Sequence, residues 1–85
     1  MLLDTKEAEC TIQVLRILDK GTSKYKNMFR ETKVSHTTLQ GVLKELIQKD
    51  FIERKDNGKN DIDYRINEKG KNFWKKLKEL NMLSR

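Results

Sequence analysis

The chain has 85 residues, of which 35% are hydrophobic and 38% are charged. This length suffices for one small domain, so we expect residues 1–85 to form a single domain, and one so small that oligomerisation would help to stabilise it. Nineteen Lys and Arg against thirteen Asp and Glu give a net charge of +6, which indicates an anionic partner such as nucleic acid, although a solvated charged surface is the alternative.

Several classes of protein are excluded by what the chain lacks. A single cysteine, Cys10, and a single histidine, His36, cannot build a disulfide framework or an ordinary structural zinc site. We find no nucleophile–base pair, phosphate-binding loop or metalloprotease motif, so we expect no enzyme, cofactor or metal. No apolar run approaches the roughly 18 residues of a membrane span. We therefore expect a cytoplasmic, nucleoid-associated protein with no membrane partner and with Cys10 as a buried structural thiol.

Apolar residues recur at helical spacing over residues 8–18, and Asp4 or Thr5 supplies a cap for this first helix. Gly21 suits its end. We expect a second, short helix after a cap at Thr22 or Ser23. A third helix over residues 35–49 begins at the cap Ser35 and carries a clean apolar stripe. The stripe consists of Leu39, Val42, Leu43, Leu46 and Ile47.

The period changes from 3.6 to 2 after the third helix. Residues 51–55 and residues 62–66 read as two strands, and Asn57-Gly58 between them is a strong turn signal because both residue types tolerate positive φ. Asn67 supplies the cap of a last helix over about residues 67–82, in which Gly70 indicates a close neighbour. The fold class is therefore α+β but mainly α, with a three-helix core, a two-stranded wing and a C-terminal helix. Helices two and three together fit a helix-turn-helix.

The charge is unevenly distributed along the chain. Residues 22–34 hold four Lys or Arg and one Glu, a net +3, and residues 67–85 hold six and two, a net +4. Residues 51–66 balance at four and four. On the face opposite its apolar stripe, the third helix carries small polar side chains and a glycine. Such a face can approach the base edges in the major groove of DNA, which is about 12 Å wide. This favours nucleic-acid contact over a solvated face, which would carry more Glu and Lys.

The segment from Ser35 to Ile52 resembles the recognition helix of winged helix-turn-helix transcription regulators. The ending Tyr64-Arg-Ile-Asn-Glu-Lys-Gly70 resembles the strand and helix start that close their wing. With residues 24–34 ahead of it, the chain is most similar to small archaeal single-domain regulators, related to the MarR and ArsR groups and to archaeal proteins that dimerise through a terminal coiled-coil helix. The resemblance covers residues 10–80.

The resemblance implies double-stranded DNA as the partner and assigns three sets of DNA-binding residues. The groove-facing positions are Ser35, His36, Thr37, Gln40, Gly41 and Lys44; the phosphate-facing positions are Lys24, Lys26 and Lys33; the wing positions are Arg54, Lys55, Lys59 and Arg65. This chain departs from the family in two ways, because Gly41 stands where a long basic residue is frequent and because the wing is neutral overall. No metal-sensing cluster is present.

We therefore predict a sequence-selective DNA-binding transcription regulator, most simply a repressor, with residues 35–49 in the major groove. The alternatives are a winged-helix protein-interaction module and a non-specific chromatin-type DNA-binding protein. We further predict a homodimer, because two-fold dimers suit palindromic sites and because the last helix carries a stripe of large apolar groups. That stripe consists of Phe73, Trp74, Leu77 and Leu80, and completion of the monomer core is the other explanation for it.

Overall fold

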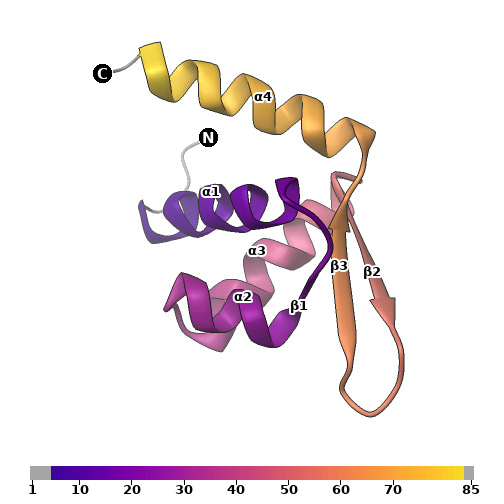
Figure 1. Cartoon of the computed structure of the whole chain (residues 1–85). Coiled ribbons are helices and arrows are strands. Elements are labelled where there is room, and N and C mark those ends of the chain that lie inside the picture. The colour runs from indigo at the N-terminus through magenta and orange to yellow at the C-terminus, as the bar shows by residue number, and fades with distance from the viewer. Residues whose placement is uncertain (1–4, 84–85) are drawn as a thin grey trace.

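The computed structural model describes residues 5–83. Figure 1 shows α1 in the middle of the molecule, with α4 on one side of it, α2 and α3 on the other, and the sheet along the edge. The predicted order of three helices, a hairpin and a last helix is confirmed, whereas the predicted cap of the first helix, Asp4 or Thr5, lies outside the described side chains. The elements are α1 (Thr5–Asp19), β1 (Ser23–Lys24), α2 (Tyr25–Thr32), α3 (His36–Gln48), β2 (Ile52–Asp56), β3 (Ile62–Ile66) and α4 (Glu68–Leu83).

One hydrophobic core joins all four helices to the sheet, because α1 packs against α2, α3, α4 and β3. The apolar stripe of α3 faces this core as predicted, with Ile47 at its partly buried edge. Cys10 is fully buried, as expected of a structural thiol, and burial, followed by the nearby charge of Glu7, raises its pKa. The buried apolar residues are Cys10, Val14, Leu15, Leu18, Met28, Leu39, Val42, Leu43, Leu46, Ile52, Tyr64 and Trp74.

The sheet has three antiparallel strands in the order β1-β3-β2: β2 and β3 form the predicted two-stranded wing, and β1 is a further strand that was not predicted. Ser23 pairs with Tyr64 and Lys24 with Asp63. The predicted capping of the second helix by Thr22 or Ser23 is wrong. Ser23 pairs with β3 as part of β1, so the N-cap of α2 is Lys24, whose side chain makes no capping hydrogen bond. Two residues are too short a strand to show a period in the sequence.

The caps predicted for the last two helices are confirmed. The hydroxyl of Ser35 accepts a hydrogen bond from the Thr38 amide at 3.2 Å, and the side chain of Asn67 accepts one from the Gly70 amide at 2.7 Å. Gly70 has the close neighbour that its position indicated, since a Cβ there would overlap the carbonyl oxygen of Phe51. Side-chain caps and this close approach together set where α3 and α4 begin.

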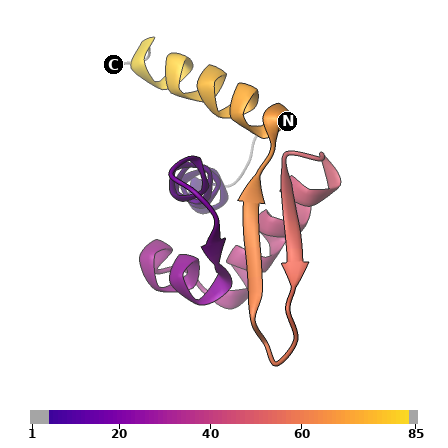
Figure 2. The same cartoon turned by 45° about the vertical axis from the view of Figure 1, so that its right-hand side comes forward.

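The β2–β3 hairpin is the predicted wing, paired from Ile52 opposite Ile66 to Asp56 opposite Ile62. Its loop lies where Asn57-Gly58 predicted a turn, but the positive φ values fall on Gly58, Lys59 and Asn60. The reason is that residues 57–61 form a five-residue loop, in which the Asn57 amide donates to the Asp61 carbonyl at 2.8 Å. In Figures 1 and 2 the tip of this hairpin points away from α4.

Candidate nucleic-acid interface

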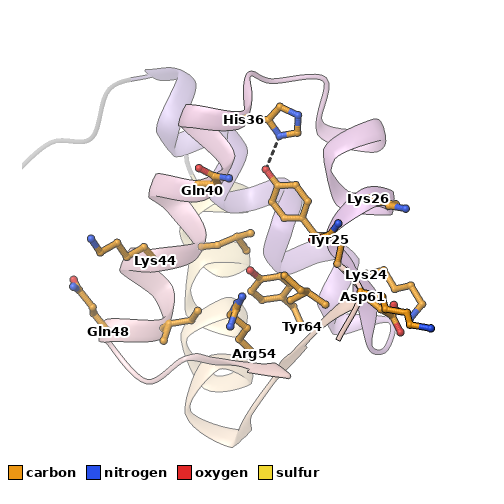
Figure 3. Close-up of a pocket in the computed structure, with 15 residues that line it drawn as sticks. Lys24, Tyr25, Lys26, His36, Gln40, Lys44, Gln48, Arg54, Asp61 and Tyr64 are labelled. Atoms are coloured by element: carbon orange, nitrogen blue, oxygen red, sulfur yellow. Dashed lines mark hydrogen bonds and ion pairs between the residues drawn. The ribbon is translucent and has the colours of Figure 1, made fainter. Parts of the chain in front are cut away.

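A groove of about 900 Å³ lies between α3, the start of α2 and the β2–β3 hairpin. Figure 3 shows the polar side chains of α3 along one wall, with Arg54 and Tyr64 of the hairpin across from them. Five cations line it against one carboxylate, so the groove is positively charged. The lining residues are Lys24, Tyr25, Lys26, His36, Gln40, Leu43, Lys44, Ile47, Gln48, Arg54, Lys59, Asn60, Asp61, Ile62 and Tyr64.

The α3 wall is a ladder of polar side chains. His36, Gln40, Lys44 and Gln48 are four residues apart, which places them above one another on one face of the helix. All four are exposed. The structure thus brings together the predicted His36, Gln40 and Lys44, and it adds Gln48, which was not among the predicted DNA-binding positions.

The other predicted positions of α3 lie beside the groove. Ser35 is occupied by capping, and Thr37 is exposed on the outer surface of the helix. Gly41 is also exposed, and a Cβ at this position would meet no described atom within 4 Å. Packing within the described part of the protein therefore gives no reason for a glycine at position 41.

His36 belongs to an aromatic stack at one end of the groove. A hydrogen bond of 2.8 Å joins its Nδ1 to the hydroxyl of Tyr25, and its ring stacks on Phe29 with centroids 3.8 Å apart and an interplanar angle of 7°. Burial raises the pKa of the Tyr25 hydroxyl, and the neighbouring amide of Gln40 partly offsets this rise. The stack holds the His36 ring in place, with one of its nitrogens already engaged.

Acidic neighbours engage two of the four predicted wing cations. Arg65 donates from Nε and Nη2 to Oε1 of Glu53, both at 2.9 Å. A looser pair, at 3.8 Å, joins Nη2 of Arg54 to Asp56. Lys55 and Lys59 have no carboxylate within 4.0 Å among the described residues. Only Arg54 and Lys59 of the predicted wing set line the groove, because strand alternation turns Lys55 and Arg65 to the other face of the hairpin.

The three predicted phosphate-facing lysines have different surroundings. Lys26 is exposed on the groove. Lys33 ends α2 in a left-handed conformation with φ of 57° and lies outside the groove lining. Lys24 also lines the groove, but its ammonium lies 2.5 Å from Asp61 and 3.0 Å from Asp63. Hydrogen bonds from Lys24 and then Asn57 lower the pKa of the Asp63 carboxyl.

Sequence reasoning missed the apolar floor of the groove. Leu43, Ile47, Ile62 and Tyr64 form part of it, and Tyr25 closes one end. The helical and strand periods mark these residues as core, which they also are. They also line the groove because the hairpin is separated from the edge of the α3 stripe, and no local sequence pattern encodes that separation.

The apolar residues of α4 divide between core and surface. Trp74 is 5% exposed and packs inside the monomer, and Phe73 stacks on Phe51 with ring centroids 4.5 Å apart. Leu77 is half-buried, while Leu80 is 63% exposed. The stripe therefore both completes the core and leaves apolar surface near the end of the helix.

None of the described helices has the length and apolar character needed to cross a membrane.

Several solved structures share this fold at low sequence identity. A transcriptional regulator from Clostridium thermocellum is 20% identical, with a TM-score of 0.77 over 98% of this chain and 91% of its own. Sso10a-2, a DNA-binding protein from Sulfolobus solfataricus, is 18% identical, with a TM-score of 0.78 over 96% and 82%. A putative transcriptional regulator from Salmonella typhimurium is 22% identical, with a TM-score of 0.79 over 89% and 70%.

No curated protein matches the chain in sequence. The winged helix-turn-helix family matches residues 6–85, nearly the whole length. The three-residue turn between α2 and α3 and the wing of β2 and β3 are the features that name this fold. The chain therefore belongs to the winged helix-turn-helix family.

Proposed function

We propose that this protein is a DNA-binding transcription regulator that places α3 in the major groove of duplex DNA and its wing beside it. The observation that carries the proposal is the groove between α3 and the hairpin, with five cations above an apolar floor. Lysines and arginines neutralise phosphates and release counterions, which supplies most of the affinity. The cytoplasmic nucleoid would be its place of action.

Base recognition falls to the α3 ladder. An amide such as that of Gln40 pairs bidentately with adenine N6 and N7, and a lysine such as Lys44 pairs with guanine O6 and N7. Gly41 fits base recognition by this face, since no packing among the described residues requires a glycine there and the absence of a side chain lets the α3 backbone approach the bases. His36 would contact a base or phosphate through the ring nitrogen that Tyr25 does not engage. Ser35 and Thr37, at the start of α3, would contact the DNA backbone.

Phosphate contacts would come from both sides of the α3 ladder. Lys26 would meet one DNA strand, and Arg54 and Lys59 of the wing would meet the other, because Lys26 lines the groove from α2 and the other two line it from the hairpin. Lys33, next to the start of α3, would reach a flanking phosphate. Lys55 and Arg65 lie on the far face of the hairpin and would contact DNA only where it bends around the wing.

A homodimer would present two copies of α3 to a two-fold symmetric site. Leu77 and Leu80 would form its interface, because the core leaves Leu77 partly and Leu80 largely uncovered. Trp74 and Phe73 would support this surface from beneath. Bound across a promoter, such a dimer would block other proteins and act as a repressor.

Selection of bound fragments from random duplexes, followed by titration of the selected site at several salt concentrations, tests the proposal. Lys26→Ala should reduce the slope of log affinity against log salt by about one unit. Lys75→Ala, an exposed lysine on α4 far from the groove, is the matched control and should leave the slope unchanged. Equal binding to all duplexes would favour a chromatin-type protein, whereas no binding would favour a protein-interaction module with Leu80 as its exposed anchor.

A further inference from the structure

A closed ring of four polar side chains ties the wing to the start of α2. The Lys24 ammonium donates to Oδ1 of Asp61 at 2.5 Å and to Oδ1 of Asp63 at 3.0 Å. The other oxygen of each carboxylate faces Asn57, whose Nδ2 donates to Asp63 at 3.0 Å and to Asp61 at 3.4 Å. Each carboxylate therefore bonds the lysine on one side and the loop amide on the other. We call Lys24, Asn57, Asp61 and Asp63 the wing latch.

The wing latch crosses the weakest connection in the sheet. Strand β1 has two residues, and Lys24 opposite Asp63 is its last pair with β3. Beyond that pair the hairpin and its loop, residues 56–62, extend away from the helices, as Figure 2 shows. Besides the apolar packing of Ile62, the Lys24 side chain thus supplies the hydrogen bond by which the helical body holds the projecting part of the wing.

The energy of such a contact is small, because its members are exposed to solvent. The Lys24 and Asp61 side chains are about half exposed, and exposed ion pairs contribute little to stability. Two carboxylates of like charge two residues apart would nevertheless repel each other without the ammonium between them. The ring therefore decides where the loop lies more than whether the protein folds.

We propose that Lys24 is a positioning residue, which sets the angle of the wing through Asp61 and Asp63 rather than contacting a phosphate itself. The inference rests on the proposed DNA-binding function, and it reassigns the residue that the family resemblance marks as phosphate-facing. Lys26, two residues further along and also on the groove, has no carboxylate within 4.0 Å among the described residues. These two lysines have the same chemistry and separate roles.

Phosphate contact and wing positioning differ in how they affect the salt dependence of DNA binding. A lysine that contacts a phosphate displaces condensed counterions from DNA, so its removal lowers the salt slope by about one unit. A lysine that keeps its two aspartates in the complex displaces none. Its removal instead leaves a mobile loop with two carboxylates that have lost their ammonium partner, one of which, Asp61, lines the groove. Binding then weakens because the wing is misplaced and because Asp61 repels phosphate.

The experiment compares Lys24→Gln with its matched control Lys26→Gln, both at exposed positions. The first measurement needs no DNA: backbone ¹⁵N relaxation of the free protein over residues 57–61. We expect the order parameters of this loop to fall in Lys24→Gln and to stay at the wild-type values in Lys26→Gln, with only small changes in either melting temperature. Unchanged loop order in Lys24→Gln would overturn the latch, and it would do so whether or not the protein binds DNA.

The second measurement is the salt dependence of binding to a selected duplex. We expect Lys26→Gln to lower the slope by about one unit and Lys24→Gln to weaken binding with its slope near that of the wild type. A slope that falls by about one unit in Lys24→Gln as well would mean that Lys24 leaves its aspartates for a phosphate, which refutes the positioning role. If the wild type binds no duplex, the proposed function fails, and the relaxation data still decide whether Lys24 holds the wing.

Discussion

Replacing Gly70 by alanine tests the contact that seats α4 against the base of the wing. A Cβ at this position would overlap the carbonyl oxygen of Phe51 and lie 2.7 Å from Cγ1 of Ile66. The same Phe51 carbonyl accepts a hydrogen bond from the Asn67 amide at 3.1 Å. Because the obstacle is backbone, rotation of a side chain does not relieve it. The start of α4 has to shift away from Phe51, which directly precedes β2.

The change in the free energy of unfolding is the sum of two destabilising terms and one stabilising term. Overpacking destabilises by about 1–3 kcal/mol, and weakening the Asn67–Phe51 hydrogen bond adds about 1 kcal/mol. Alanine recovers about 1 kcal/mol of helix propensity over glycine. The free energy of unfolding should therefore fall by about 1–3 kcal/mol, a large share of the stability of so small a domain.

Urea unfolding followed by circular dichroism at 25 °C measures the change, and Gly41→Ala is the matched control. Gly41 is also helical, but its Cβ would meet no described atom within 4 Å, so this variant should gain up to about 1 kcal/mol. A Gly70→Ala protein as stable as the wild type would show that the close approach does not constrain α4. Gly41→Ala should bind a selected duplex less tightly in spite of its greater stability, if its face of α3 approaches bases.

Three further predictions concern a buried hydroxyl, a carboxyl and an exposed apolar side chain. Thr32 is buried and its hydroxyl finds no hydrogen-bond partner in the described chain, so Thr32→Val should raise the free energy of unfolding by about 1 kcal/mol in urea titration. The pKa of Asp63 is lowered in the folded protein, so its stabilising effect is present above the unfolded pKa of about 3.9 and is lost as pH falls through the folded value. The stability difference between wild type and Asp63→Asn should therefore shrink in urea titrations below about pH 4, and a difference independent of pH would contradict the lowered pKa. Leu80→Glu should shift sedimentation from dimer to monomer without loss of helix content; a wild-type protein that is monomeric even on DNA would refute the α4 dimer.

Local periodicity was sufficient to predict most of the fold. The α3 stripe from Leu39 to Ile47, its cap at Ser35 and the alternation of β3 are properties of neighbouring residues, and each predicted its element correctly. The strand β1 could not be predicted in this way, since its two residues form a strand only by pairing with β3, about forty positions later. The same limit explains the mistaken cap at Ser23.

The candidate site was predictable along α3 and much less so across the groove. The polar ladder of His36, Gln40 and Lys44 follows from removing the apolar stripe from one helix. The pairing of Lys24 with Asp61 and Asp63 joins residues 37 and 39 positions apart, and it depends on where the hairpin folds back. The role of Trp74 was equally undetermined, because a stripe on one helix does not state whether the same chain or a second copy covers it.

Recognition of bases by the α3 ladder is tested most directly by Gln40→Ala, measured on a duplex selected from random sequence and on an unselected duplex at the same salt concentration. Loss of a bidentate contact to adenine should weaken binding to the selected duplex by about 1–3 kcal/mol, while binding to the unselected duplex changes little. Gln13→Ala, on α1 and outside the groove lining, should leave both affinities unchanged. If Gln40→Ala binds the selected duplex as tightly as the wild type does, then Gln40 does not read bases, and the groove beside α3 is not the surface that selects DNA sequence.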